Sequence, residues 1–168
     1  YGASAHQRSR LLVYDLGGGT FDVSVVAVEA GVVEVLASTG DNHLGGDDFD
    51  RLILERLNAH IRAELGIEMP EEDLTLQSRL RRAAEQAKIA LSTDIYVRVD
   101  ENHVGVVDEH PRHLSQELSR PDFEADLETR LTRTMELMST ALQDAGIQPR
   151  QLDQVLLVGG STRIPRIA

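Results

Sequence analysis

Three consecutive glycines at residues 17–19 separate two short segments that favour β-structure. Residues 11–15 form an apolar run before them, and residues 21–29 alternate apolar and polar side chains with the period of two expected of a strand. Gly31 permits a second reversal, after which residues 32–38 are again rich in β-branched side chains. Glycines favour tight turns because they adopt backbone conformations that are closed to other residues. The N-terminal part is therefore predicted to be an antiparallel meander of three strands.

Two amphipathic helices are predicted in the middle of the chain, after a polar, glycine-rich loop at residues 39–48. Apolar side chains recur at spacings of three and four over residues 49–65, and Gly66 ends this pattern as a C-cap residue does. A proline and three acidic residues then open a second helical pattern, which predicts a helix over residues 70–91.

A β-hairpin is predicted after the second helix. Residues 95–99 and 104–107 alternate in polarity, and the polar residues 100–102 between them predict the turn. Residues 110–119 have the least defined pattern in the chain.

A third helix is predicted from a capping signal. Ser119 and Asp122, three residues apart, form a variant of the capping box. The apolar pattern that follows continues to Gly146 and includes Met135 and Met138, which we interpret as core residues.

The last segment completes a mixed α/β chain. Residues 155–158 have the composition of a buried strand, and a glycine–glycine turn then leads to a helix predicted to start near Ser161. The order of elements predicts a core subdomain made of residues 1–47 and 120–168. Residues 48–119 are predicted to form an inserted subdomain of helices and a hairpin.

Composition excludes several classes of protein. The net charge of −11 argues against nucleic-acid binding, which needs clustered lysine and arginine side chains. No apolar run approaches the roughly 18 residues that span a bilayer, and no signal peptide opens the chain. We therefore expect a cytoplasmic protein without membrane association. The chain has no cysteine and therefore no disulfide framework. It has no initial methionine and ends soon after a Gly–Gly turn, so we expect it to be a segment of a longer protein.

The glycine-rich segment 15–22 is the first candidate binding site. Its glycines allow several backbone N–H groups to point at one anion, and a threonine hydroxyl follows them. The candidate phosphate ligands are Gly17, Gly18, Gly19 and Thr20. Asp15 and Asp22 flank the turn and are candidates to hold Mg²⁺ through its water molecules. The segment matches neither the dinucleotide nor the Walker pattern, and a glycine-rich turn without a ligand is the alternative interpretation.

The turn after the last strand is the second candidate site. Gly159, Gly160 and Ser161 lead from a strand to a helix N-terminus, which suits a phosphate or a ligand lying flat against the backbone. The planar guanidinium of Arg163 is suited to stacking on a base. The alternative is a strand-to-helix turn with a surface arginine.

One face of the second predicted helix is the third candidate. Glu85, Lys88 and Ser92 share this face with Ile89, and Lys88 is the only lysine in a chain that otherwise uses arginine. A carboxylate, an ammonium and a hydroxyl beside an apolar side chain suit a ribose and a purine. A solvated helix face with an ordinary Glu–Lys pair is the alternative.

Three segments together resemble the DnaK chaperone family: LVYDLGGGTFD at residues 12–22, GDNHLGGDDFD at 40–50 and VLLVGGSTRIP at 155–165. The resemblance covers essentially the whole chain and is weakest at residues 93–119. It implies an α/β fold, namely one actin-like ATPase (ribonuclease-H-like) lobe with an inserted α+β subdomain. Two such lobes would close over ATP, and this chain resembles most of the second lobe.

The resemblance also implies roles for the candidate residues. Gly18, Gly19 and Thr20 would bind the β- and γ-phosphates of ATP, and Asp15 and Asp22 would face the Mg²⁺ shell. The adenosine side would be formed by Glu85, Lys88, Ile89, Ser92, Gly159, Gly160, Ser161 and Arg163. Ile89 stands where some members carry a basic residue, so one base-stacking contact would be apolar. We expect the two glycine turns to lie close together, with the helix face bordering the same cleft.

The chain itself would carry no complete catalytic set, since the family's other phosphate loop, phosphate-contacting lysine and catalytic carboxylate belong to the first lobe. Phosphoryl transfer needs all these groups at once, so the isolated chain is predicted to be inactive. The parent protein would couple ATP hydrolysis to binding and release of unfolded polypeptides, with a J-domain co-chaperone and a GrpE-like exchange factor as partners. The alternatives are another actin-like ATPase, such as a filament-forming or sugar-kinase relative, and a non-catalytic lobe that docks a partner.

Overall fold

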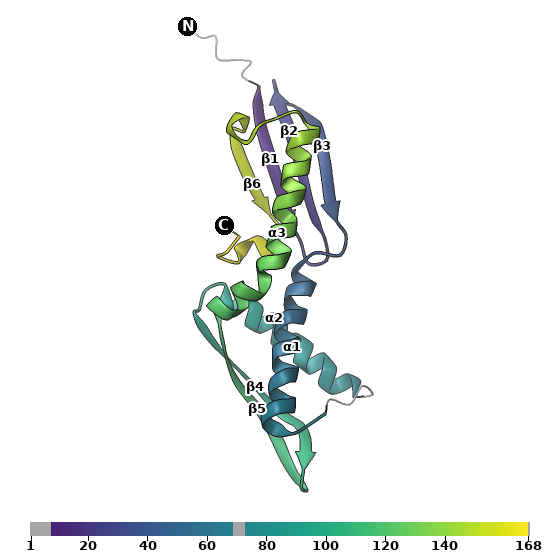
Figure 1. The fold of residues 1–168 in the computed structure, drawn as a ribbon, viewed down its shortest axis with the longest axis vertical. Coiled ribbons are helices and arrows are strands. Elements are labelled where there is room, and N and C mark those ends of the chain that lie inside the picture. Colours follow the sequence, from purple (N-terminus) through teal and green to yellow (C-terminus); the bar gives the residue numbers. More distant parts are fainter. Residues whose placement is uncertain (1–7, 69–72, 168) are drawn as a thin grey trace. The chain divides into compact units, whose positions relative to one another are not determined.

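The computed structural model describes residues 8–68 and 73–167, which form two compact units. Unit 1 contains the chain up to Gly46, together with Thr129–Arg163 and Ile167. Unit 2 contains Asp47–Glu128 and Ile164–Arg166. The elements of both units are labelled in Figure 1.

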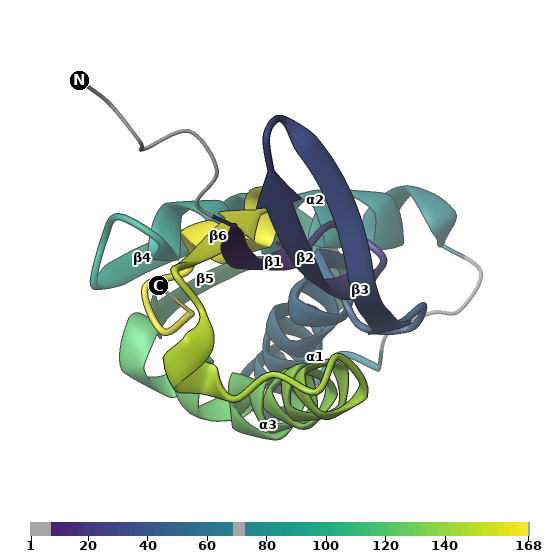
Figure 2. The same ribbon diagram turned by 90° about the horizontal axis from the view of Figure 1, so that it is seen from above.

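Unit 1 is built on a four-stranded sheet in the order β3-β2-β1-β6 (Figure 2). Its strands are β1 (Ser9–Leu16), β2 (Phe21–Glu29), β3 (Val32–Asp41) and β6 (Gln154–Val158). The first three pair antiparallel, which confirms the predicted meander, and β6 pairs parallel with β1. β3 continues beyond its predicted end because Thr39, Gly40 and Asp41 pair with the start of β2. The predicted loop at residues 39–48 is therefore much shorter.

One face of the sheet carries the core of unit 1. Alternate residues of β1 and β2 are buried, as the period of two predicts: Leu12, Tyr14, Leu16, Phe21, Val23 and Val25. Helix α3 (Arg120–Asp144) contributes Leu137 and Ala141, which are also buried. The Tyr14 hydroxyl donates to Thr134 Oγ1 at 3.0 Å, and the Thr134 hydroxyl donates to the Leu131 carbonyl at 2.8 Å. This short chain of hydrogen bonds ties α3 to the middle of the sheet.

Removing the Tyr14 hydroxyl with Tyr14→Phe is expected to lower the free energy of unfolding by about 1 kcal/mol at neutral pH, because one buried hydrogen bond is lost. Burial raises the pKa of Tyr14 above its ordinary value of 10.0, although the hydrogen bond with Thr134 partly lowers it. A raised folded-state pKa gives stability that is complete below pH 10 and lost as the pH rises through the folded value. Urea denaturation should therefore show the difference between wild type and variant shrinking above pH 10.0. A difference independent of pH would contradict this account.

The last strand was predicted to be buried, and this prediction is wrong. Val155, Leu157 and Val158 are exposed, Val155 by 47%. β6 pairs with β1 along one edge, and no other described strand pairs with its second edge. Met135, interpreted as a core residue, is 62% exposed and lines an apolar groove together with Met138 and Val155. These residues were predicted to be buried because they are apolar. Composition alone does not show whether another part of the chain covers an apolar residue.

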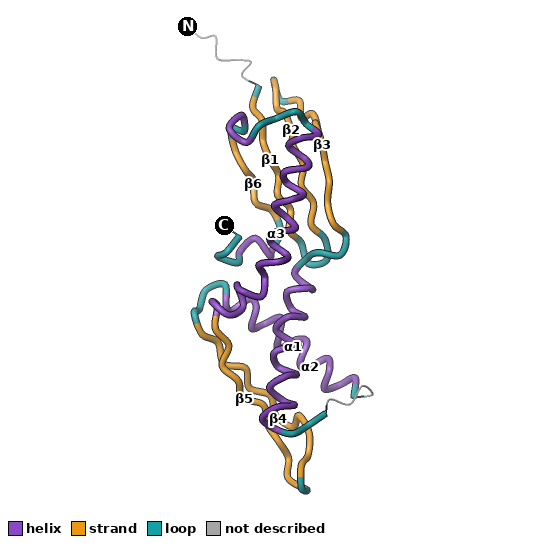
Figure 3. The backbone as a smooth tube through the Cα atoms, viewed as in Figure 1, coloured by secondary structure: helices purple, strands orange, loops and turns teal. Residues whose placement is uncertain are grey.

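Unit 2 contains two helices, a hairpin and the beginning of α3 (Figure 3). Its other elements are α1 (Gly46–Leu65), α2 (Leu74–Leu91), β4 (Tyr96–Val107) and β5 (His110–Ser119). Gly66 follows α1 with φ +67°, as predicted for a C-cap glycine. Asp73 caps α2 by accepting a hydrogen bond from the Leu76 N–H at 2.9 Å, while the predicted start at Pro70 lies outside the described residues. The capping signal before α3 is confirmed, since the Asp122 N–H donates to Ser119 Oγ.

The hairpin turn is not where the alternation of polarity predicted it. The turn is formed by Asp108 and Glu109, both with positive φ, and the weakly patterned residues 110–119 are the second strand. The predicted turn lies inside β4, next to a bulge between Glu101 and Gly105. A bulge adds a residue to one strand and so interrupts the alternation of apolar and polar side chains. The sequence pattern of this part of β4 therefore resembled that of a turn.

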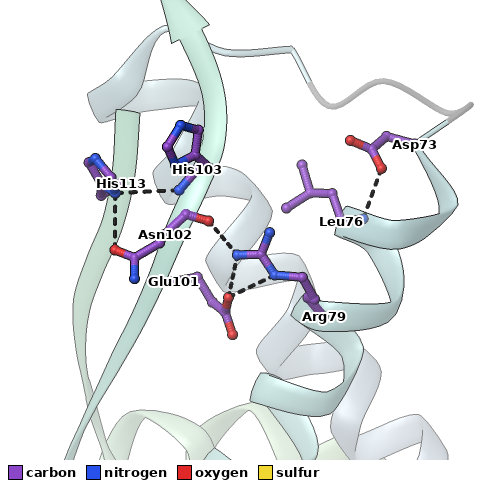
Figure 4. A network of polar contacts seen from close by, with 7 residues as sticks. All are labelled: Asp73, Leu76, Arg79, Glu101, Asn102, His103 and His113. Atoms are coloured by element: carbon purple, nitrogen blue, oxygen red, sulfur yellow. Dashed lines mark hydrogen bonds and ion pairs between the residues drawn. The ribbon is translucent and has the colours of Figure 1, made fainter. Parts of the chain in front are cut away.

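Polar contacts hold the bulge against α2 (Figure 4). Arg79 of α2 forms an ion pair with Glu101 at 2.6 Å and donates to the Asn102 carbonyl. The His103 N–H donates to His113 Nδ1 across the hairpin at 3.3 Å. One arginine therefore connects the helix to the irregular part of the strand.

Unit 2 is larger than the predicted insertion at residues 48–119. α3 is continuous from Arg120, and its first turns place the buried side chains of Phe123 and Leu127 in unit 2. The boundary between the units falls within the helix, after Glu128. Within the described ranges, no helix has the length and apolar character needed to cross a membrane.

Candidate functional site

The glycine turn between β1 and β2 presents free backbone donors between two carboxylates. Asp15 and Asp22 are direct partners in the register of the two strands, so their backbones face each other at the base of the turn. The Gly17 N–H donates to the Thr20 carbonyl at 3.0 Å and closes the turn. Gly18 and Gly19 are exposed, and no backbone acceptor in the described chain occupies their N–H groups. Gly17 therefore shapes the turn, and the next two glycines are the ones that can receive an anion.

The second glycine turn packs directly against the first. Gly159 has φ +92°, and a Cβ atom there would lie 2.2 Å from the Leu16 carbonyl oxygen and 3.0 Å from Asp15 Oδ1. The Ser161 hydroxyl donates to the Gly17 carbonyl at 3.0 Å. The prediction that the two turns lie close together is confirmed by these contacts.

A third glycine segment supports the first turn, and the sequence analysis had assigned it no part in the binding site. The Gly46 N–H donates to the Gly17 carbonyl at 3.0 Å, so this carbonyl is shared by the second and third segments. A Cβ atom at Gly45 would lie 2.4 Å from the Gly18 carbonyl oxygen. A Cβ atom at Gly40 would lie 2.6 Å from Asp22 Oδ1. The signal was present in the glycines of residues 40–50, but sequence spacing does not show which backbone they approach.

The remaining candidates of unit 1 lie just after β6. Gly160 and Arg163 are exposed, whereas Ser161 is buried. Residues Gly160–Arg163 form a short 3-10 helix at the place where a helix was predicted to start, near Ser161. The exposed Arg163 is free of the packing that fixes Ser161.

The third candidate group lies at the end of α2, in unit 2. Glu85 is exposed, and Ile89 leaves 59% of its surface exposed although it is apolar. Ser92 is the C-cap of α2, and its hydroxyl donates to the Lys88 carbonyl at 3.4 Å. All of these residues belong to the last turns of α2, whose helical spacing places Glu85, Lys88 and Ser92 on one face, as predicted.

Lys88 has a partner that no sequence pattern predicted. Its Nζ lies 2.9 Å from Asp50 Oδ1 on α1, and the two side chains are only 14% and 21% exposed. Burial raises the pKa of the Asp50 carboxyl, the Lys88 ammonium opposes this, and the negative charges of Glu85 and Asp47 raise it further. Asp50 and Lys88 are 38 positions apart in the sequence, and no local pattern connects them.

The candidate residues therefore form two groups. The first, in unit 1, is organised by contacts among three glycine segments, and the second occupies one end of α2 in unit 2. The assembly of both groups around one ligand stays a prediction. In the described chain, no cluster of three or more histidine, aspartate or glutamate side chains is placed to hold a metal ion.

The family model described as Hsp70 protein matches residues 1–168. The chain therefore belongs to the Hsp70 family. Members of this family are chaperones with an ATPase domain that binds ATP or ADP with Mg²⁺. The mixed α/β structure, with its two sheets and three long helices in the described residues, has the fold class predicted for an actin-like ATPase lobe.

Proposed function

We propose that this chain is the second lobe of the ATPase domain of a DnaK-type chaperone and supplies half of its ATP site. One observation carries the proposal: the turns at Gly17 and Gly159 are in contact, beside Asp15, and meet at the Gly17 carbonyl. A turn held from two sides leaves its exposed N–H groups in fixed positions. Preorganised donors of this kind stabilise phosphate charge without having to reorganise when the ligand binds.

The phosphates and the metal ion are assigned to the first turn. Gly18 and Gly19 donate backbone N–H groups to the β- and γ-phosphates, and Thr20 adds its hydroxyl. Asp15 and Asp22 face the Mg²⁺ ion through water. Two carboxylates fit this role, because Mg²⁺ keeps several of its water molecules and rarely takes an all-protein set of ligands.

The adenosine is assigned to both groups of candidate residues. Arg163 is exposed and offers its guanidinium plane to the base, and Ile89 offers an exposed apolar surface. The remaining adenosine residues are Glu85, Lys88, Ser92, Gly159, Gly160 and Ser161. The proposal is that all of these residues contact one nucleotide.

The parent protein is proposed to be a cytoplasmic chaperone that hydrolyses ATP to ADP and phosphate. Hydrolysis would drive binding and release of unfolded polypeptides, assisted by a J-domain co-chaperone and a GrpE-like exchange factor. The family match and the resemblance of the three motif segments support this proposal.

The purified chain is expected to bind Mg²⁺–ADP weakly and to show no ATP turnover, because its catalytic set is incomplete. In amide NMR spectra, Mg²⁺–pyrophosphate and Mg²⁺–ADP should both shift the signals of Gly18, Gly19 and Thr20. Thr20→Val, which keeps the shape but removes the hydroxyl, should weaken both responses. Steady release of phosphate from ATP, at a rate that co-purifies with the chain, would contradict the half-site assignment. If the amide signals of Gly18 and Gly19 did not shift at millimolar ligand, the result would instead favour the alternative of a non-catalytic lobe that docks a partner.

A further inference from the structure

The only lysine of the chain is held by a carboxylate from a different helix. Lys88 Nζ and Asp50 Oδ1 are 2.9 Å apart, and both side chains are largely buried. Four other ion pairs of the described residues join arginines to acids that are at least 60% exposed. A pair that is largely withdrawn from water is screened less by solvent and salt than a surface pair.

The core of unit 2 fixes the positions of both partners. On α1, Asp50 follows the buried Phe49 in the sequence and lies one turn before the buried Ile53. On α2, Lys88 follows the buried Ala87 and lies in the last turn of the helix, where unpaired carbonyl groups favour a cation. The helices therefore present the ammonium group at a defined place, and Asp50 contributes to its orientation.

The surroundings of the pair are strongly charged. A groove of about 710 Å³ between α1 and α2 is lined by acids of both helices, including Asp47, Asp50, Glu55 and Glu85, and by Arg51, Arg81 and Arg82. The Asp50 carboxyl therefore stands among other negative charges. Asp50 is a carboxylate that the structure places in contact with the Lys88 ammonium, at 2.9 Å.

We propose that Asp50 is a positioning residue for nucleotide binding, which acts by orienting the Lys88 ammonium toward the ligand. The inference rests on the proposed adenosine role of Lys88. An ammonium group has three N–H donors, so it can contact Asp50 and a ligand acceptor at the same time. Asp50 itself does not contact the nucleotide.

A competing role for Asp50 makes the opposite prediction. If the Asp50 carboxylate competed with the nucleotide for the Lys88 ammonium, the ligand would have to displace it. Removing the carboxylate would then tighten nucleotide binding. If the pair only stabilised unit 2, its removal would lower stability and leave the affinity of the folded protein unchanged. The sign of the change in affinity separates these roles.

The single lysine permits a direct experiment. Labelling with ¹³C,¹⁵N-lysine gives side-chain signals from Lys88 alone, and these can be followed during titration with Mg²⁺–ADP. Asp50→Asn should require about tenfold more nucleotide for half-saturation, which is the ratio expected from the loss of one charged hydrogen bond. Asp50→Glu keeps the charge, is expected to keep the fold and should lose less affinity. The matched control is Glu55→Gln, which removes an exposed acid from the same helix and groove and should change the affinity less than about twofold.

Two further measurements exclude a purely structural effect. In a double-mutant cycle, Asp50→Asn should add nothing in the Lys88→Met background, because it acts through the lysine. The response of Gly18 and Gly19 to Mg²⁺–pyrophosphate should be the same in wild type and Asp50→Asn, because the phosphate turn belongs to the other unit.

The outcomes distinguish this inference from the function on which it rests. Unchanged or tighter Mg²⁺–ADP binding by Asp50→Asn and Asp50→Glu would overturn the positioning role and leave the nucleotide site intact. Equal losses from Asp50→Asn with and without Lys88 would overturn it as well. If Mg²⁺–ADP moved neither the Lys88 signals nor those of Gly18 and Gly19 in the wild type, the proposed function itself would fail.

Discussion

Replacing Gly159 with alanine is expected to lower the free energy of unfolding by about 3–5 kcal/mol, a large effect for one methyl group. Two causes add. The backbone has φ +92°, where a residue with a Cβ atom is strained by about 1–3 kcal/mol. The new Cβ would also lie 2.2 Å from the carbonyl oxygen and 2.5 Å from the carbonyl carbon of Leu16. These are backbone atoms at the end of β1, so no side-chain rotation relieves the overlap.

The adjacent glycine provides the matched control. A Cβ atom at Gly160 would meet nothing within 4 Å, and this residue does not have a positive φ. Gly160→Ala should therefore change stability by less than about 0.5 kcal/mol, as for most surface substitutions. Urea denaturation followed by circular dichroism compares the two variants directly. Similar midpoints for both would show that the contact between Gly159 and Leu16 does not constrain unit 1.

The periodic elements could be predicted from the sequence because one physical rule governs each of them. Half-buried strands alternate, as β1 and β2 do, and helices that cover a core repeat at three and four, as α1 does. The bulge in β4 and the exposure of β6 were missed for a related reason. Alternation is informative only while a strand remains regular, and burial depends on what the rest of the chain covers.

The candidate site could be predicted in its parts but not in its contacts. The turns at Gly17 and Gly159 were identified because adjacent glycines at the end of a strand favour a tight turn with accessible backbone N–H groups. The supporting role of Gly45 and the pairing of Asp50 with Lys88 were not identified. Both depend on atoms brought together by the fold from distant parts of the sequence, and a single sequence contains no pattern that records such contacts.

Gly45→Ala is expected to affect both stability and the phosphate turn. Gly45 is buried, and a Cβ atom there would lie 2.4 Å from the Gly18 carbonyl oxygen and 2.7 Å from the Gly19 carbonyl carbon. The methyl group can be accommodated only if one backbone segment moves away from the other, which should lower the free energy of unfolding by about 2–3 kcal/mol. The moved turn would no longer hold its N–H groups in place.

This second effect separates Gly45→Ala from an ordinary destabilising variant. The response of Gly18 and Gly19 to Mg²⁺–pyrophosphate should weaken by more than about tenfold under conditions in which the variant is still folded, because misplaced donors lose the advantage of preorganisation. His43→Ala is the control: this exposed residue belongs to the same loop, and its hydrogen bond to Asp41 uses the backbone N–H, which the substitution keeps. A Gly45→Ala variant that lost stability but kept the full phosphate response would show that the turn at Gly17 is held by Gly159 and Ser161 alone. Because the Gly17 carbonyl accepts from both Ser161 and Gly46, we expect both supports to be required.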